Sequence, residues 1–180
     1  MGATHAMKAL LVDAALLPLV RYQGKDACTL LEYDANYSFI IRDLPSDTLV
    51  IKYDRFPSTK DVFFKSEHSE CKRADYILIS ESNKVVMYIE LKHSNKSAAS
   101  KDIVAQLKGA KCVVDYMQSI AMQFLGEPMI FADYTHLYYK GIIKAPRKRS
   151  FGRTELLNTS PEFPRTLAGS FASFGHLLHG

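Results

Sequence analysis

The chain has 180 residues, of which 47% are hydrophobic and 23% charged, and its formal net charge is +4. A chain of this length buries roughly 70% of its unfolded surface, so one domain with a sizeable core is expected. No stretch approaches the ~20 uncharged apolar residues of a membrane-spanning helix, which predicts a soluble protein. Three scattered cysteines, without a CxxC or Cys/His cluster, argue against a disulfide framework and a zinc site and predict a cytoplasmic, intracellular setting.

The positive charge is unevenly distributed along the chain. The whole excess of positive charge lies after residue 143, in a segment that contains six basic residues and two acidic ones. Such a segment can attract phosphates, although a solvated charged loop explains the same pattern. We expect 145–180 to be a basic, loop-rich C-terminal extension of a single domain whose core spans about 8–144. The predicted nucleic-acid contacts are the clustered cations of this extension: Arg147, Lys148, Arg149 and Arg153.

The first part of the chain predicts one helix followed by strands. Apolar residues within 8–22 indicate an amphipathic helix, with Gly24 as its C-terminal cap. Residues 1–7 are compatible with an expression scar before a natural start at Met7, so no functional role is inferred for His5. The polar segment 54–72, which contains a proline, predicts an irregular loop. Between the predicted helix and this loop, three strands with alternating apolar residues are expected: 28–33, 37–42 and 48–53.

The middle of the chain predicts a β-hairpin and then a long helix. Residues 73–80 and 84–92 are largely apolar and are joined by Glu81-Ser82-Asn83, which favours a tight turn. From 101 to 124, apolar residues alternate spacings of four and three, which indicates an amphipathic helix with Ser100 as its N-cap. Strand, turn, strand and helix therefore follow one another directly.

The remaining segments complete an expected α/β fold. Residues 129–143 are rich in β-branched and aromatic side chains and predict one bent strand or two shorter ones. The chain after 143 predicts loop with short helical or strand pieces, and Phe171 and Phe174 are expected to dock on the core. The expected architecture is a mixed central sheet of about four or five strands flanked by α-helices.

Three side chains of the predicted hairpin are candidates for metal-dependent chemistry. Asp75 lies near the start of the first strand and Glu90 near the end of the second, so antiparallel pairing would bring the two carboxylates to the same end of the sheet. Magnesium is held by one or two carboxylates together with water and substrate phosphate. Lys92 lies on the same strand face as Glu90, where its ammonium could orient an attacking water or stabilise negative charge. This set suits phosphodiester hydrolysis.

A hydrophobic strand that ends in Glu90-Leu91-Lys92, with Asp75 fourteen residues upstream and a following helix that carries Gln106, resembles the PD-(D/E)XK nuclease superfamily. That superfamily includes restriction endonucleases, Holliday-junction resolvases and RecB-type exonuclease domains. The resemblance covers about a quarter of the chain and implies a restriction-endonuclease-like core. It also implies that Asp75, Glu90 and the main-chain carbonyl of Leu91 bind Mg²⁺ or Mn²⁺. Lys92 would be the catalytic lysine, and Gln106 would position that lysine or a metal-bound water.

The chain departs from the family pattern at three places. Ala74 stands where the family has proline, a common variation. Many members contribute a further acidic residue from an early helix, and Glu32, Glu67 and Glu70 are the candidates here, with metal stoichiometry left open. Ala110 occupies the position of the tyrosine found in the RecB-like branch, so exonuclease behaviour is not supported.

The same residues also permit structural interpretations. An isolated ExK triplet is common, so Glu90 and Lys92 could form an ordinary surface salt bridge, and Asp75 could solvate a strand end. His93, on the opposite strand face from Lys92, is typical of a loop residue. His136 lies among tyrosines that either pack half-buried in a sheet or stack on bases. For His136 itself, a sheet-surface position is the simpler interpretation.

We therefore expect a divalent-metal-dependent nuclease that cuts DNA, endonucleolytically, with the basic C-terminal segment on backbone phosphates. Two alternatives stay open. The first is a non-catalytic nucleic-acid-binding or assembly module of the same fold. The second is a nuclease subunit of a larger defence or repair complex whose partner supplies specificity. A homodimer or a larger complex is compatible with these hypotheses, and no membrane partner is expected.

Overall fold

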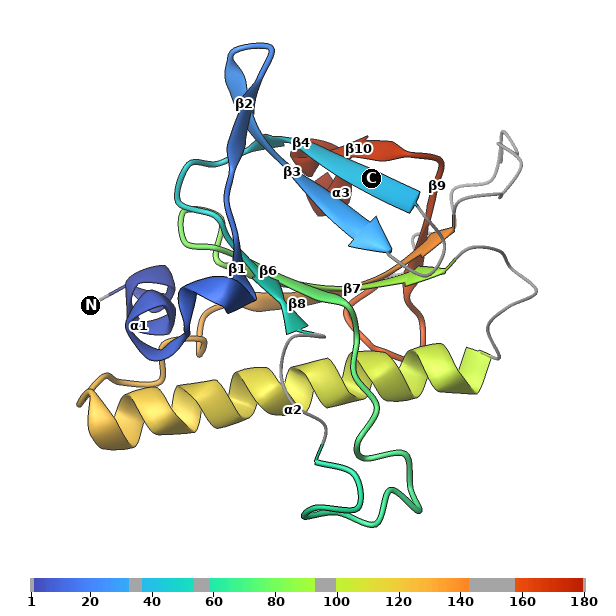
Figure 1. Ribbon diagram of the computed structural model, residues 1–180. Coiled ribbons are helices and arrows are strands. Elements are labelled where there is room, and N and C mark those ends of the chain that lie inside the picture. The colour runs from blue at the N-terminus through green and yellow to red at the C-terminus, as the bar shows by residue number, and fades with distance from the viewer. Residues whose placement is uncertain (1, 33–36, 54–58, 93–99, 143–157, 180) are drawn as a thin grey trace.

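The computed structural model describes residues 2–32, 37–53, 59–92, 100–142 and 158–179 (Figure 1). The protein is a mixed α/β structure that consists mostly of sheet. Its helices are α1 (Ala3–Leu10), α2 (Ser100–Phe124) and α3 (Phe174–His179), with a 3-10 turn at Asp13–Ala15. Its strands are β1 (Leu16–Leu17), β2 (Val20–Tyr22), β3 (Lys25–Glu32), β4 (Tyr37–Leu44), β5 (Leu49–Lys52), β6 (Tyr76–Ser80), β7 (Val85–Lys92), β8 (Thr135–Ile142), β9 (Arg165–Ala168) and β10 (Phe171–Ser173).

The strands of the described segments form two sheets. A six-stranded sheet has the order β1-β5-β6-β7-β8-β9, in which β1, β5, β6 and β7 pair antiparallel and β7, β8 and β9 pair parallel. A four-stranded sheet has the order β10-β4-β3-β2. The expectation of a single sheet with four or five strands is therefore wrong. Local alternation in the sequence predicts that β3 and β4 are strands, but their pairing into a separate sheet depends on long-range packing, which local alternation does not encode.

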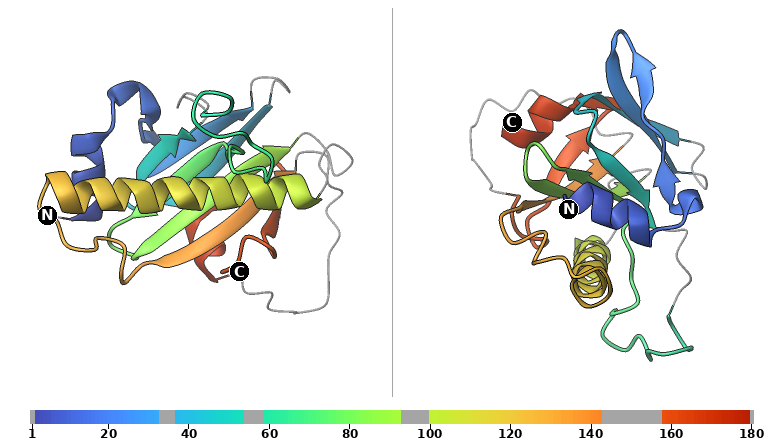
Figure 2. Two further views of the ribbon diagram at one scale, coloured as in Figure 1. Left: turned by 90° about the horizontal axis from the view of Figure 1, so that it is seen from below. Right: turned by 90° about the vertical axis from the view of Figure 1, so that its left-hand side faces the viewer.

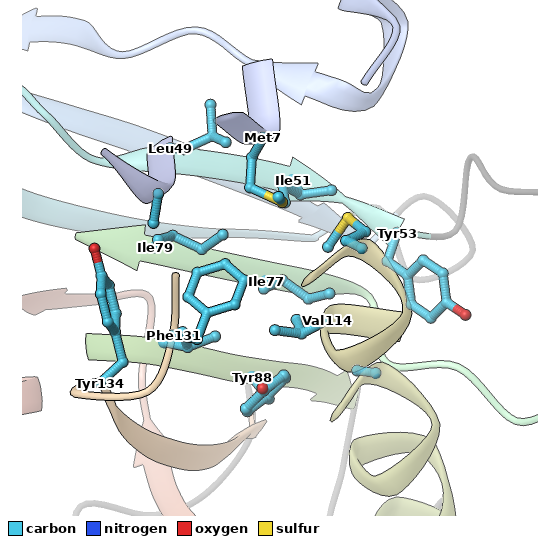
Figure 3. Close-up of a cluster of buried hydrophobic side chains, with 14 of the residues drawn as sticks. Met7, Leu49, Ile51, Tyr53, Ile77, Ile79, Tyr88, Val114, Phe131 and Tyr134 are labelled. Carbon is cyan, nitrogen blue, oxygen red and sulfur yellow. The ribbon is translucent and has the colours of Figure 1, made fainter. Parts of the chain in front are cut away.

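Helices and the second sheet cover opposite faces of the six-stranded sheet. α1 and α2 pack on one face, where Met7, Ile51, Ile77 and Val114 share a core (Figure 3). The four-stranded sheet and α3 pack on the other face (Figure 2). No helix in the described part of the chain is long and apolar enough to cross a bilayer.

Strand β7 is the centre of the molecule because both of its faces are buried. Val86 and Tyr88 pack in the core beneath the helices, whereas Met87 and Ile89 pack in the core beneath the second sheet. This double burial explains why the strand is an almost continuous apolar run. Only the last three residues of β7 include charged side chains.

The predicted hairpin and long helix are confirmed. β6 and β7 pair antiparallel across a turn that begins at Glu81, and α2 begins at Ser100 and ends at Phe124. Leu107 and Val114, on the predicted apolar face of α2, are fully buried. The strands expected within 28–53 are also present. β8 is shorter than the expected 129–143 strand, because turns fill the segment before Thr135.

The predicted helix over 8–22 is wrong. α1 ends at Leu10, and Leu16 and Leu17 instead form an edge strand opposite Val50 and Ile51. A short run of leucines suits either structure, and Pro18 prevents the helix from continuing. Ala3 to Met7, within the segment interpreted as an expression scar, belong to α1, and three of its residues are buried: Ala3, Ala6 and Met7.

Gly24 is a hairpin residue and not a helix cap. Gln23 and Gly24 have φ angles of 50° and 80°, and they connect β2 to β3, which pair antiparallel. Positive φ at both central positions matches the twist of a tight β-hairpin. The predicted helix cap at Gly24 is therefore wrong.

The C-terminal segment contributes strands to both sheets. β9 pairs parallel with β8, and β10 pairs parallel with β4. Phe174 is buried against the second sheet, as expected, and α3 continues from it. Phe171 is 45% exposed, and its ring lies 4.0 Å from the guanidinium carbon of Arg42, so docking of this ring in the core is wrong.

Candidate metal site

Asp75 and Glu90 meet at one end of the β6–β7 hairpin. The last ladder pair there is Tyr76 opposite Ile89, so the next position along places Asp75 opposite Glu90. The backbone N–H of Leu91 donates a 2.7 Å hydrogen bond to Asp75 Oδ2. The predicted hairpin thus does bring the two residues together, and the main chain of β7 orients one of the carboxylates.

Neighbouring strands fix the backbone on both sides of this pair. The N–H of Tyr53, just after β5, donates a 2.9 Å hydrogen bond to the carbonyl oxygen of Asp75. On the other side, Leu91 lies opposite Gly141 of β8, and a Cβ at Gly141 would stand only 2.6 Å from Leu91 Cδ2. The absence of a side chain at Gly141 therefore lets β8 pack closely beside the end of β7.

Glu90 is a fully buried carboxylate with few partners. Its side chain is 1% exposed, and its Oε1 forms an ion pair with Lys92 Nζ. Within the described residues, Oε2 has no hydrogen-bond partner. A buried charge with an unsatisfied oxygen destabilises a fold unless another cation or donor compensates it. Lys92 remains 24% exposed, so the ion pair has an opening to solvent on its lysine side.

The charges of Asp75, Glu90 and Lys92 alter the pKa values of Glu90 and Lys92. Burial raises the pKa of Glu90 to about 8, and the charge of Asp75 adds to that rise, while Lys92 opposes it. Burial by itself lowers the pKa of Lys92, but the charges of Glu90 and Asp75 outweigh burial and raise that pKa, so Lys92 stays protonated. An added cation would favour the ionised form of Glu90.

Tyr76 joins the second sheet to this end of the hairpin. Its hydroxyl donates to the carbonyl oxygen of Leu31 and accepts from the backbone N–H of Leu31, both at 2.7 Å. Tyr76 directly follows Asp75, and Leu31 directly precedes Glu32, the last residue of β3. The hydroxyl therefore fixes the end of β3 beside the candidate site.

The structure separates the three acidic candidates that the sequence left open. Glu67 is exposed and lies 3.9 Å from Lys65. Glu70 accepts hydrogen bonds from two backbone N–H groups of its own loop. Only Glu32 acts on the site, because its charge contributes to the raised pKa values of Glu90 and Lys92. The sequence pattern of β3 predicts a strand but does not indicate what its end adjoins.

Other predicted site residues lie apart from this group or cannot be placed. Gln106 is half-buried on the flank of the apolar stripe of α2, and no hydrogen bond joins its side chain to another described residue, so its role stays a prediction. Several predicted residues lie outside the described residues: His93, Arg147, Lys148, Arg149 and Arg153.

His136 belongs to an aromatic stack away from the carboxylates. Its Nδ1 lies 2.8 Å from the hydroxyl of Tyr88, and the two rings stack with centroids 5.8 Å apart. The ring of Tyr138 also stacks on the ring of Tyr88, with centroids 4.9 Å apart. Burial lowers the pKa of His136, and the nearby charge of Lys111 lowers it further. The tyrosines of β8 pack in the sheet, as the structural interpretation of the sequence predicts, but Tyr138 and Tyr139 are buried and not half-buried.

The candidate residues supply oxygen atoms of the kind that a hard divalent cation takes as ligands. No group of three or more His, Cys, Asp or Glu side chains in the described segments already has metal-binding geometry. Magnesium, however, needs only one or two carboxylates, with waters and other oxygens completing its coordination. Asp75 and Glu90, with the Leu91 carbonyl that the family resemblance adds, are a donor set of that kind. Glu90 Oε2, which has no hydrogen-bond partner among the described residues, is the atom that a cation would satisfy.

Comparison of the chain with protein-family models, with curated proteins and with solved structures finds no match. Function is therefore inferred from the chemistry of the site, since a fold alone does not determine an activity.

Proposed function

We propose that this protein is a divalent-metal-dependent nuclease that hydrolyses phosphodiester bonds and acts on DNA as an endonuclease. The observation that carries the proposal is the buried carboxylate of Glu90, opposite Asp75 and paired with Lys92. An ordinary surface salt bridge does not describe this pair, because Glu90 is 1% exposed and its Oε2 lacks a hydrogen-bond partner among the described residues. Such an arrangement weakens the fold and is typical of a functional site.

Each residue has a chemical role in the proposal. Asp75, Glu90 and the main-chain carbonyl of Leu91 would hold Mg²⁺ or Mn²⁺. The cation, when bound, supplies positive charge for the phosphate oxygens and acidifies a bound water. The ammonium of Lys92 is protonated and partly exposed, so it can contact a substrate phosphate or orient the attacking water.

The order of elements supports a restriction-endonuclease-like core. An antiparallel hairpin carries the two acidic residues, and α2 then connects β7 to its parallel neighbour β8. The basic cluster within 147–153 is proposed to contact backbone phosphates. The cysteines at 28, 71 and 112 are free thiols, which is compatible with the proposed cytoplasmic setting.

The proposal is tested by cleavage of plasmid, linear duplex, single-stranded and branched DNA, and of RNA, with Mg²⁺ or Mn²⁺. We expect cleavage of at least one DNA by the wild type and none above background with EDTA or with Lys92→Ala. Lys25→Ala removes a lysine from the β2–β3 hairpin, where its Nζ lies 3.2 Å from Asp43, and should leave cleavage unchanged.

Two other results would replace the proposal. An uncut panel that is nevertheless shifted in a gel-binding assay would indicate a non-catalytic nucleic-acid-binding module. Cleavage that appears only after a partner protein is co-purified would indicate the subunit of a larger complex, and size-exclusion chromatography would distinguish that case from a self-sufficient enzyme or homodimer.

A further inference from the structure

We propose that the loop of residues 59–72, named the Phe63 loop, binds the DNA substrate and that the ring of Phe63 stacks on one of its bases. The inference rests on the proposed function for the identity of the ligand and extends that function to how the substrate is held. It concerns side chains outside the carboxylate group.

The tip of the Phe63 loop carries three consecutive apolar side chains in solvent. Val62, Phe63 and Phe64 are 84%, 81% and 47% exposed. Single exposed apolar residues are ordinary on protein surfaces, whereas a run of three is typical of a contact surface. The rings of Phe63 and Phe64 meet edge to face, with centroids 4.9 Å apart. The tip therefore exposes aromatic area of the kind that a ligand covers.

Backbone hydrogen bonds hold this tip in a defined shape. The carbonyl oxygen of Thr59 accepts from the N–H groups of Phe63 and Phe64, at 2.9 and 3.0 Å. The N–H of Asp61 donates to the carbonyl oxygen of Phe64 at 2.9 Å, and Asp61 has a φ angle of 59°. A tip that is ordered before binding loses less conformational entropy when a ligand covers it.

The base of the loop is fixed to α2, on the face of the sheet that also carries the carboxylates. A Cβ at Gly109 would lie 1.9 Å from the carbonyl oxygen of Lys72, and Lys72 Nζ lies 3.6 Å from Asp102 in the first turn of α2. Glu90 shares a strand face with Tyr88, which packs in the core beneath α2. The loop projects past α2 into solvent (Figures 1 and 2). A substrate that approaches from this side would meet the loop.

A groove of about 530 Å³ lies between the Phe63 loop and the exposed side of α2. The carboxylates that line it already have partners: Glu70 accepts from two backbone N–H groups of the loop, and Glu162 pairs with Lys108 at 2.7 Å. Lys101, also in the groove, has no carboxylate partner among the described residues. The groove thus offers a cation that a phosphate can neutralise.

A further cation stands beside the aromatic tip. Lys65 directly follows Phe64, and its side chain is exposed. Its partner Glu67 lies 3.9 Å away, and exposed ion pairs of this kind contribute little. Aromatic rings next to cations suit a nucleic acid, because bases stack on the rings while phosphates contact the cations. A lipid surface also accepts an apolar tip beside a lysine, but the groove and the shared sheet face favour the substrate.

Fluorescence anisotropy of a labelled single-stranded DNA, titrated with the full chain in EDTA, tests the inference without cleavage. We expect Phe63→Ala to weaken binding about tenfold, because stacking of a base on an aromatic ring contributes roughly that much to affinity. Phe124→Ala is the matched control, since that ring is also 81% exposed but lies at the other end of α2 from Lys101. It should bind DNA as the wild type does.

Two further variants resolve the chemistry of the contact. Phe63→Trp keeps a stacking ring and should retain at least wild-type affinity, which guards against a misfolded alanine variant. Lys65→Ala should reduce the slope of log affinity against log salt concentration by about one. Phe63→Ala should leave that slope unchanged, because the ring carries no charge. A slope that falls in Phe63→Ala would contradict stacking.

The outcomes separate this inference from the proposed function. Wild-type affinity in a folded Phe63→Ala sample, or no DNA binding by the wild type, would overturn the inference, whereas catalysis is tested independently by Lys92→Ala. If the cleavage panel stays uncut while Phe63→Ala weakens binding, the proposed catalysis fails and the stacking contact stands. If Phe63 is needed for co-sedimentation with phosphatidylcholine–phosphatidylserine vesicles and not for DNA binding, the tip contacts lipid and the inference is wrong.

Discussion

The two ends of the β6–β7 hairpin use polar residues in opposite ways. At the turn end, Asp47 Oδ2 accepts a 2.7 Å hydrogen bond from the backbone N–H of Ser82, and Asn83 Nδ2 donates to Ser80 Oγ at 3.0 Å. At the other end, Glu90 is buried, its Oε2 has no hydrogen-bond partner in the part of the chain that the structure describes, and burial raises its pKa to about 8. The first arrangement satisfies the backbone and stabilises the fold, whereas the second costs stability, which the proposed cation would compensate. This contrast within one hairpin supports the proposal that the carboxylate end is the functional one.

The largest expected effect is on cleavage at the carboxylate end. Asp75→Asn keeps the size of the side chain but removes a charge that a cation needs, so the cleavage rate should fall by about 100-fold or more. Asp47→Asn makes the same change at the turn end and should cut DNA at the wild-type rate. Initial rates on the best DNA of the panel measure both variants. Equal losses in the two variants would remove the functional distinction between the ends.

The next effect concerns the pH dependence of stability without metal. A carboxyl whose folded pKa is raised stabilises the fold below its unfolded pKa of 4.5 and loses that contribution as pH rises toward 8. In EDTA, the wild type should therefore lose on the order of 3 kcal/mol between pH 5 and pH 8, relative to Glu90→Gln. Urea unfolding at the two pH values gives the difference. An identical pH dependence in both proteins would show that Glu90 is not strained by its burial.

A third effect concerns the loop that carries the chain into Asp75. A Cβ on Gly109 of α2 would lie 1.9 Å from the carbonyl oxygen of Lys72, so the loop lies directly against the helix. Gly109→Ala should lower the free energy of unfolding by about 2 kcal/mol and reduce cleavage, because the loop must move. Gly175→Ala, in α3 with open space around it, is the matched control and should leave cleavage unchanged without lowering the free energy of unfolding, because alanine favours a helix more than glycine does. Thermal unfolding that coincides for the two variants would contradict this packing.

The smallest effect is expected at the turn end itself. Asp47→Ala removes the acceptor of the Ser82 N–H and should lower the free energy of unfolding by about 1 kcal/mol. Cleavage should be unchanged, in contrast to the carboxylate variants. Denaturant unfolding and the same cleavage assay measure the two properties, and a loss of activity with unchanged stability would assign a functional role to this end as well.

Residues close together in sequence determined the elements that carry the candidate site. The alternation of 84–92 and the three- and four-residue spacing of α2 reflect burial of a strand and of one helix face, and both patterns are local. The turn at Glu81 sets the antiparallel register, and that register alone places Asp75 opposite Glu90. The ends of this hairpin could therefore be predicted from the sequence.

Tertiary structure decided what surrounds that hairpin. Leu16 and Leu17 suit a helix or a strand equally well, and the open edge of β5 selected the strand. The pairing of β10 with β4 joins segments far apart in the chain, which no local pattern encodes. The hydroxyl of Tyr76 connects the two sheets by its hydrogen bonds to the backbone of Leu31, next to Glu32. Short-range periodicity in the sequence thus determined that Asp75 and Glu90 lie opposite each other. The burial of Glu90 and the effect of the Glu32 charge on its pKa arise only when distant strands pack together.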